Sequence, residues 1–242
     1  YKIEDRNDLV IYEMLLRDFT KNQNLAGALE QLDYIDQLGV NAIELMPIQE
    51  FDGNLSWGYN PNHYFALDKA YGTREMYKDF IDECHRRGIA VIVDVVYNHL
   101  TGLSTYAKLY YNGDKTSADN PWFNVDAPHP FSVFHDINHD NEIISQHIKQ
   151  SLGYFLKEYD IDGFRFDLMA IHDLDTMNEI SERLHAIDPD VVIYGEGWAA
   201  SAPAFPEDKI ALKVNTHMMD KVGAFSDNIR DALRGPLDCS NA

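Results

Sequence analysis

The sequence predicts an α/β fold, a TIM (β/α)₈ barrel truncated to about six βα units. Apolar strand-like runs alternate with amphipathic helical stretches, which is typical of a parallel sheet with crossover helices. Polar residues gather where several of these runs end, as active residues do in barrels. A doubly wound sheet also alternates, but it normally has a glycine-rich phosphate turn after the first strand. No G-x-G-x-x-G is present, which favours the barrel.

The first half of the chain predicts three strands and two helices. Apolar residues recur every three or four positions between 25 and 38, and Gly39 ends that helix. The β-branched run at 89–96 is typical of a strand that is buried on both faces. The expected strands are 10–12, 42–46 and 89–96, and the expected helices are 25–38 and 74–87.

The second half continues the alternation after a long irregular segment. The expected helices are 142–159, 174–187 and 228–233, and the expected strands are 163–168, 191–194 and 222–225. Because segment 100–140 has no strong periodicity and leaves too few residues for eight strands, we expect a truncated barrel with a functional loop. The predicted domains are a partial catalytic barrel, 1–99 and 141–242, and an inserted loop domain, 100–140.

Composition restricts the class of partner. The formal net charge is −20, from 40 acidic and 20 basic side chains. Such a chain repels phosphates and anionic lipids, so neither nucleic acid nor a membrane is expected as a partner, whereas a neutral sugar is compatible. The two cysteines, Cys84 and Cys239, do not form a disulfide framework. The chain starts at Tyr1 without a signal peptide, which leaves cytoplasmic and secreted locations both open.

Charged residues end three of the predicted strands. The stretches are DVVYNH from Asp94 to His99, GFRFD ending at Asp167, and YGEGW around Glu196. Buried charges are costly unless they are paired or used, so clusters on successive barrel strands should converge on one site. A single Asp at a strand end is usually a capping residue, and an Arg–Asp pair is often only a structural salt bridge. The combination of the three stretches favours catalysis.

These stretches resemble the shared motifs of the α-amylase superfamily, glycoside hydrolase family 13. DVVYNH resembles its first conserved region, GFRFD its second and GEGW its third. The resemblance implies a retaining hydrolase in which Asp167 is the nucleophile and Glu196 the general acid and base, with one carboxyl group protonated and the other ionised. It also implies that Asp94 orients Arg165 and that His99 binds sugar hydroxyls. Arg165 is expected to keep Asp167 ionised.

A loop after the second predicted strand resembles that of the type I pullulanases. Residues 56–61 read SWGYNP, where those enzymes usually have WGYDP, so Asn60 departs from the pattern. The resemblance implies that Tyr59 stacks under the sugar at the cleavage point. The alternative is a turn with an aromatic side chain packed beneath it. Trp198 would wall a sugar subsite or serve a structural role.

The residues after the expected nucleophile also resemble pullulanases. Ala170 and Ile171 stand where many plain α-amylases have Lys-His, and His172 follows. The resemblance implies an α-glucan substrate that is cleaved at α-1,6 branch points. The alternatives are an α-1,4-acting amylase or a transglycosylase and, in another class, a non-catalytic barrel that binds glucan or a partner protein. A barrel for phosphorylated substrates is disfavoured by the charge and the missing phosphate loop.

The family's fourth conserved region and its calcium site lead to two further expectations. The fourth conserved region, a His-Asp pair, has no match between 233 and 242, so we expect little activity from the fragment by itself. No metal or other cofactor is expected. Calcium bound by Asn98 and carboxylates of the insert is the alternative, since calcium takes six to eight oxygen ligands. The candidate carboxylates are Asp119, Asp126, Asp136 and Asp140.

Overall fold

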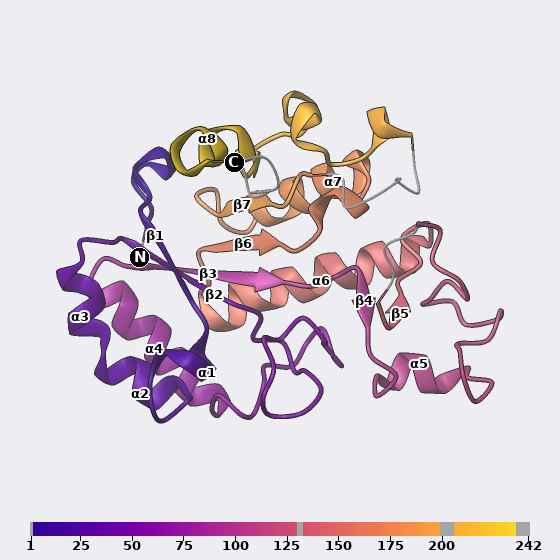
Figure 1. Ribbon diagram of the computed structural model, residues 1–242, viewed down its shortest axis with the longest axis horizontal. Helices are drawn as coiled ribbons and strands as arrows, with labels where there is room; N and C mark the ends of the chain where they lie inside the picture. Colours follow the sequence, from indigo (N-terminus) through magenta and orange to yellow (C-terminus); the bar gives the residue numbers. More distant parts are fainter. Residues whose placement is uncertain (1, 130–132, 199–205, 236–242) are drawn as a thin grey trace.

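The computed structural model describes residues 2–129, 133–198 and 206–235, and these contain a six-stranded, fully parallel sheet (Figure 1). The strand order is β1-β2-β3-β6-β7-β8, which is also their order along the chain. This confirms the predicted class of fold, and within the described residues β1 and β8 are the two edges of an open sheet. The strands are β1 (Ile11–Met14), β2 (Ala42–Leu45), β3 (Ala90–Val95), β6 (Gly163–Phe166), β7 (Val192–Gly195) and β8 (Val222–Ala224).

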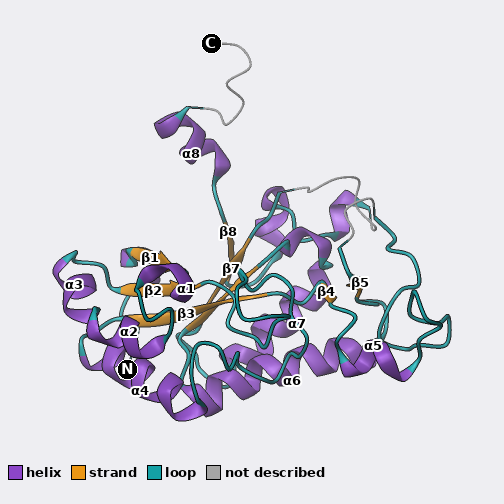
Figure 2. Cartoon of the chain, turned by 60° about the horizontal axis from the view of Figure 1, so that its bottom comes forward, coloured by secondary structure: helices purple, strands orange, loops and turns teal. Residues whose placement is uncertain are grey.

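Helices connect the successive strands of the sheet from β1 to β7. The long helix α6 runs beneath the strands, and α8 stands apart from the other helices (Figure 2). The helices are α1 (Leu16–Phe19), α2 (Leu25–Glu30), α3 (Leu32–Gln37), α4 (Arg74–Arg86), α6 (Glu142–Tyr159), α7 (Leu174–His185) and α8 (Asp227–Arg234). Short 3₁₀ turns are η1 (Arg6–Asp8), η2 (Met169–Ile171), η3 (Glu207–Lys209) and η4 (Lys213–Met218).

The predicted helix 25–38 is two helices in the structure. Gln31 has φ −104° and ψ 6°, so the backbone leaves the helical region between α2 and α3. Leu25, Leu32 and Ile35 are buried as the spacing predicts. Leu29 and Leu38, in contrast, lie 37% and 48% exposed, although the spacing places them on the buried face. The period of three and four was therefore right for only part of this segment.

The two faces of the sheet have opposite character. Odd-numbered residues of β3, such as Val91, Val93 and Val95, pack with the helices in the main hydrophobic core. Even-numbered residues face the other side, where Ala90 and Ile92 belong to a smaller apolar cluster and Asp94 is fully buried. Successive side chains of a strand alternate in this way. We call the face with the even-numbered residues of β3 the inner face. In β3 its polar residue, Asp94, lies toward the carboxyl end of the strand.

The insert leaves the carboxyl end of β3 and has a small sheet of its own. It contains α5 (Thr105–Leu109) and an antiparallel pair, β4 (His99–Leu100) with β5 (His135–Asp136). Figure 1 shows it beyond the end of β3. The domain boundary at 100 remains a prediction, although β4 spans it.

Two other sequence observations concern single residues and helix length. Cys84 is buried in α4, whereas Cys239 lies outside the described residues. Of the described helices, none is long and apolar enough to cross a bilayer.

Candidate active site

Three neighbouring strands bring the candidate residues together. In the register of the sheet Asp94 of β3 lies beside Arg165 of β6, which lies beside Tyr194 of β7. Asp167 and Glu196 directly follow the last residues of β6 and β7, and both contact Arg165 on the same face. The carboxyl ends of β3, β6 and β7 thus form one polar cluster, as the sequence predicted.

Arg165 is the centre of this cluster. Its Nη1 donates to Asp94 Oδ1 at 3.2 Å and to Asp167 Oδ1 at 3.3 Å, and its Nη2 donates to Glu196 Oε1 at 2.7 Å. Burial lowers the pKa of Arg165, but the carboxylates of Asp94 and Glu196 raise it more, so the guanidinium stays charged. One cation therefore joins three carboxyl groups that belong to three strands.

Each carboxylate oxygen of Asp167 accepts a hydrogen bond from a neighbouring side chain. Asn98 Nδ2 donates to Asp167 Oδ2 at 3.1 Å, and Arg165 holds the other oxygen. Burial raises the pKa of Asp167, and the opposing contributions of Arg165 and Asn98 are smaller, so its pKa lies above the ordinary value. Arg165 therefore contacts Asp167 and opposes the effect of burial on its pKa, and the expectation that it keeps Asp167 ionised stays a prediction.

Glu196 is held from two sides. Arg165 contacts Oε1, and the backbone N–H of Leu168 donates to Oε2 at 3.0 Å. Leu168 directly follows Asp167 and adopts the left-handed region with φ 47°. The backbone that carries one candidate carboxylate thus also binds the other.

Tyr59 and His99 complete the wall beside Asp94. The Tyr59 hydroxyl donates to Asp94 Oδ2 at 2.7 Å, and His99 Nε2 lies 2.7 Å from the Tyr59 carbonyl oxygen. Burial raises the pKa of Asp94 well above its ordinary value and lowers the pKa of His99 to about 4. Near neutral pH the His99 ring is therefore uncharged, with Nε2 donating to the loop that carries Tyr59.

The loop before Tyr59 depends on a close backbone approach. Gly58 has φ 94°, and a Cβ there would lie 2.3 Å from the Pro47 carbonyl oxygen. Asn60 accepts a short hydrogen bond from Ser56 Oγ and donates to the Asp52 carbonyl oxygen at 2.9 Å. Asn60 therefore holds the loop itself, so a residue that departs from the usual pattern has a structural task here.

Trp198 lies at the open side of the cluster. Its ring stacks on Phe225, with ring centroids 5.9 Å apart. The Arg165 guanidinium lies over the Phe225 ring, with Cζ 5.7 Å from the ring centroid. Both aromatic residues line a cavity of about 410 Å³ that also reaches Arg165 and Glu44. This contact connects Trp198 to the cluster through Phe225.

Sequence reasoning missed several residues of this site. Asn98 was considered only as a calcium ligand, whereas its amide contacts Asp167. Glu44 and Tyr194 were assigned to apolar strands, although their side chains meet on the inner face. The available signal was the period of two, because Tyr194 precedes Glu196 by two residues and Glu44 interrupts an apolar run.

The calcium alternative gains no support from the described residues. They contain no group of three or more His, Cys, Asp or Glu side chains with metal-binding geometry. Asn98 donates to Asp167, and Asp136 accepts from Asn124 and lies 3.0 Å from His129. The Asn98 amide nitrogen and the Asp136 carboxylate are thus each engaged by protein side chains.

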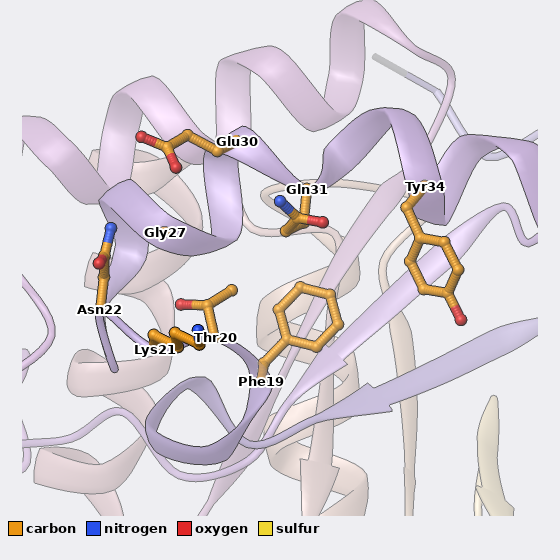
Figure 3. A pocket seen from close by; sticks show the side chains of 8 residues that line it. All are labelled: Phe19, Thr20, Lys21, Asn22, Gly27, Glu30, Gln31 and Tyr34. Carbon is orange, nitrogen blue, oxygen red and sulfur yellow. The ribbon is translucent and has the colours of Figure 1, made fainter.

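A second concavity lies away from the cluster, between α1, α2 and α3. It has a volume of about 510 Å³ and includes none of the predicted site residues. Figure 3 shows the rings of Phe19 and Tyr34 along it, with Asn22 and Glu30 at the end away from Tyr34. The carboxylate cluster is therefore the site that the sequence motifs define.

Fold and cluster together define an α/β protein with an open parallel sheet, as in a truncated barrel, and a carboxylate-rich site at the carboxyl ends of its strands. Comparison with known families places it more narrowly. The family model "Alpha amylase, catalytic domain" matches residues 18–133. The chain belongs to the α-amylase family.

Pullulanases are among the proteins that the chain resembles. The chain is 32% identical to a pullulanase of Bacillus subtilis (strain 168), over 94% of this chain and 36% of the relative. It is also 32% identical to a malto-oligosyltrehalose trehalohydrolase of Saccharolobus solfataricus, over 89% of this chain and 37% of that protein. A crystal structure of a pullulanase from Anoxybacillus sp. LM18-11, complexed with maltotetraose, superposes with a TM-score of 0.80 and 33% identity, over 95% of this chain and 38% of the other. The chain thus spans little more than a third of the length of these proteins.

Proposed function

We propose that the protein carrying this chain is a retaining glycoside hydrolase that cleaves α-1,6 branch linkages of α-glucans. The observation that carries the proposal is the placement of Asp167 and Glu196 on one guanidinium, that of Arg165. Retaining enzymes use two carboxyl groups near one glycosidic bond. The similarity to pullulanases, one of them complexed with maltotetraose, supports an α-glucan as the substrate.

The two carboxyl groups have different tasks in this proposal. Asp167 attacks the anomeric carbon while Glu196 gives its proton to the leaving oxygen, so the glycosidic bond breaks and a glycosyl ester with Asp167 forms. Glu196 then removes a proton from water, whose oxygen attacks the same carbon and releases Asp167. Arg165 keeps both groups in position, and its contact with Asp167 Oδ1 favours the ionised nucleophile against the effect of burial.

The wall residues supply binding. The Tyr59 ring stands beside Asp94, where it can stack on the apolar face of a sugar ring. His99 is neutral near pH 7 and donates its Nε2 hydrogen to the Tyr59 carbonyl oxygen, so Nδ1 is the nitrogen that can accept from a sugar hydroxyl. Trp198 is proposed to wall a subsite through its stack with Phe225.

The test is hydrolysis of pullulan and of amylose by the full-length protein, compared with Asp167→Asn. Release of maltotriose from pullulan, lost in Asp167→Asn, is the expected result. Asp175→Asn, an exposed change in the first turn of α7, is the matched control and should retain activity. Cleavage of amylose alone would replace the proposed linkage by α-1,4. No turnover of either glucan by a folded protein would refute the hydrolase and favour a glucan-binding barrel.

A further inference from the structure

One buried carboxylate near the site has no part in the proposed reaction. Glu44 lies in β2, within an otherwise apolar strand, and is 4% exposed. Its Oε2 accepts a short hydrogen bond from the Tyr194 hydroxyl of β7. A buried carboxylate is costly unless it is paired, so its contacts indicate what keeps it there.

The second oxygen of Glu44 faces Arg165 from behind. Glu44 Oε1 lies 3.9 Å from Arg165 Nε, and within the described residues that Nε is buried without a hydrogen-bond partner. The other two nitrogens of the guanidinium are occupied by the carboxylates of the candidate site. Glu44 is therefore the negative group on the one side of Arg165 that the site does not use.

Aromatic packing fixes the hydroxyl that binds Glu44. The Tyr194 ring meets Phe225 edge to face, with centroids 5.4 Å apart, and Phe225 also covers Arg165. Glu44, Tyr194, Phe225 and Arg165 thus form a closed set of contacts beneath the site. A shift of Glu44 would be transmitted to the guanidinium through both its direct attraction and Tyr194.

We propose that Glu44 is a positioning residue, which holds the Arg165 guanidinium in place on its Nε side. Its negative charge also means that the neighbouring carboxyl groups of the site lose their protons at a higher pH. The inference rests on the proposed function, because it assigns Glu44 a task in the same reaction. It goes beyond that function because neither the motifs nor the proposed steps include β2. The charged and titratable groups that face Glu44 are Glu13, Asp94, Arg165, Tyr194 and Glu196.

The electrostatic consequence has a definite direction. Burial raises the pKa of Glu44, and the Tyr194 hydrogen bond and Arg165 oppose that rise. Once Glu44 is ionised, its charge disfavours the loss of further protons from neighbouring carboxyl groups. The dependence of kcat on pH should be bell-shaped, with an acidic and a basic limb. Replacing Glu44 by Gln should move both limbs to lower pH, by about one pH unit.

The experiment measures kcat and KM for pullulan across pH in the full-length protein. Gln has the size of Glu and can accept the Tyr194 hydrogen bond, so Glu44→Gln removes the charge while keeping the contact. We expect kcat at the optimum to fall about tenfold, KM to change less than about twofold, and both limbs to move to lower pH. A merely structural role for Glu44 would leave the positions of the limbs unchanged.

Two further variants separate charge from contact. Tyr194→Phe keeps the ring and the Glu44 charge but removes the hydroxyl, so it should lower kcat without moving the limbs to lower pH. Glu13→Gln removes an exposed carboxylate in register with Glu44 on β1 and should behave as the wild type. If Glu44→Gln does not fold, Glu44→Asp replaces it, and a lower kcat with unmoved limbs is then expected.

Three results would overturn the proposal. They are a wild-type pH profile in Glu44→Gln, an equal shift in Glu13→Gln, and an unchanged kcat in Glu44→Asp where that variant has to be used. Absence of turnover by the wild type would refute the proposed function instead. In that event carboxyl titration by NMR decides the inference, since Glu44→Gln must still move the titration of the Asp94 and Asp167 carboxyl groups to lower pH.

Discussion

Replacement of Arg165 by Met tests whether this side chain holds the cluster together. Met has a similar length but no charge, so Asp94, Asp167 and Glu196 lose their common partner. Removing one member of a buried ion pair costs about 3–5 kcal/mol. Three carboxyl groups are affected, but they can take up protons, which limits the cost. We therefore expect the free energy of unfolding to fall by about 4 kcal/mol near neutral pH.

The pH dependence of this loss provides the sharper measurement. Without Arg165 the folded-state pKa values of Asp94 and Asp167, already raised by burial, rise further above their unfolded values. A carboxyl group whose folded pKa is raised destabilises the fold above that pKa and ceases to do so as the pH falls below it. The deficit should therefore shrink as urea unfolding is repeated from about pH 7 to about pH 4.

The control for Arg165→Met is Arg86→Met, because Arg86 is exposed and forms an ion pair with Glu83 at the surface of α4. It should leave the free energy of unfolding unchanged at every pH. A deficit in Arg165→Met below about 1 kcal/mol at neutral pH, or one that grows on acidification, would refute the reasoning.

Three further changes probe single contacts. Tyr59→Phe loses the hydrogen bond to Asp94 and should lower the free energy of unfolding by about 1–2 kcal/mol, whereas an unchanged urea midpoint would contradict that contact. Burial lowers the pKa of His172 to about 4, so the unfolded chain binds more protons there and stability should fall as pH drops from about 6.5 to about 4. In His172→Leu this slope should be flatter, and an equal slope would exclude His172 as its source. Gly58→Ala should raise KM for pullulan about tenfold, because its Cβ would collide with Pro47, while kcat should change little.

Long periodic segments were the easiest to predict. Helix α6 has the predicted bounds, because its apolar spacing extends over five turns and Asn141 caps its first turn. The break at Gln31 has no such signal, since the residues on both sides favour a helix. Tertiary packing of two short helices against the sheet decides that boundary, and local sequence does not contain this information.

The sequence predicted the part of the site that consists of charged residues at the ends of apolar strands. Asp94, Arg165, Asp167 and Glu196 lie at the ends of apolar runs, so their common face could be inferred. Their roles were implied by the resemblance to the family motifs and stay predictions. Glu44 and Tyr194 could not be paired in this way, because they lie 150 positions apart and on strands that are not neighbours. Only the curvature of the sheet brings them together across the inner face.

The balance of charge around Arg165 has a consequence for inhibitors. Within the described part of the chain, Arg165 is the only cation paired with the four carboxyl groups of Glu44, Asp94, Asp167 and Glu196. The oxocarbenium-like transition state of glycoside hydrolysis is itself positive. A sugar analogue with a protonated ring nitrogen would supply the missing counter-charge, so such a compound should bind more tightly than the neutral sugar of the same shape.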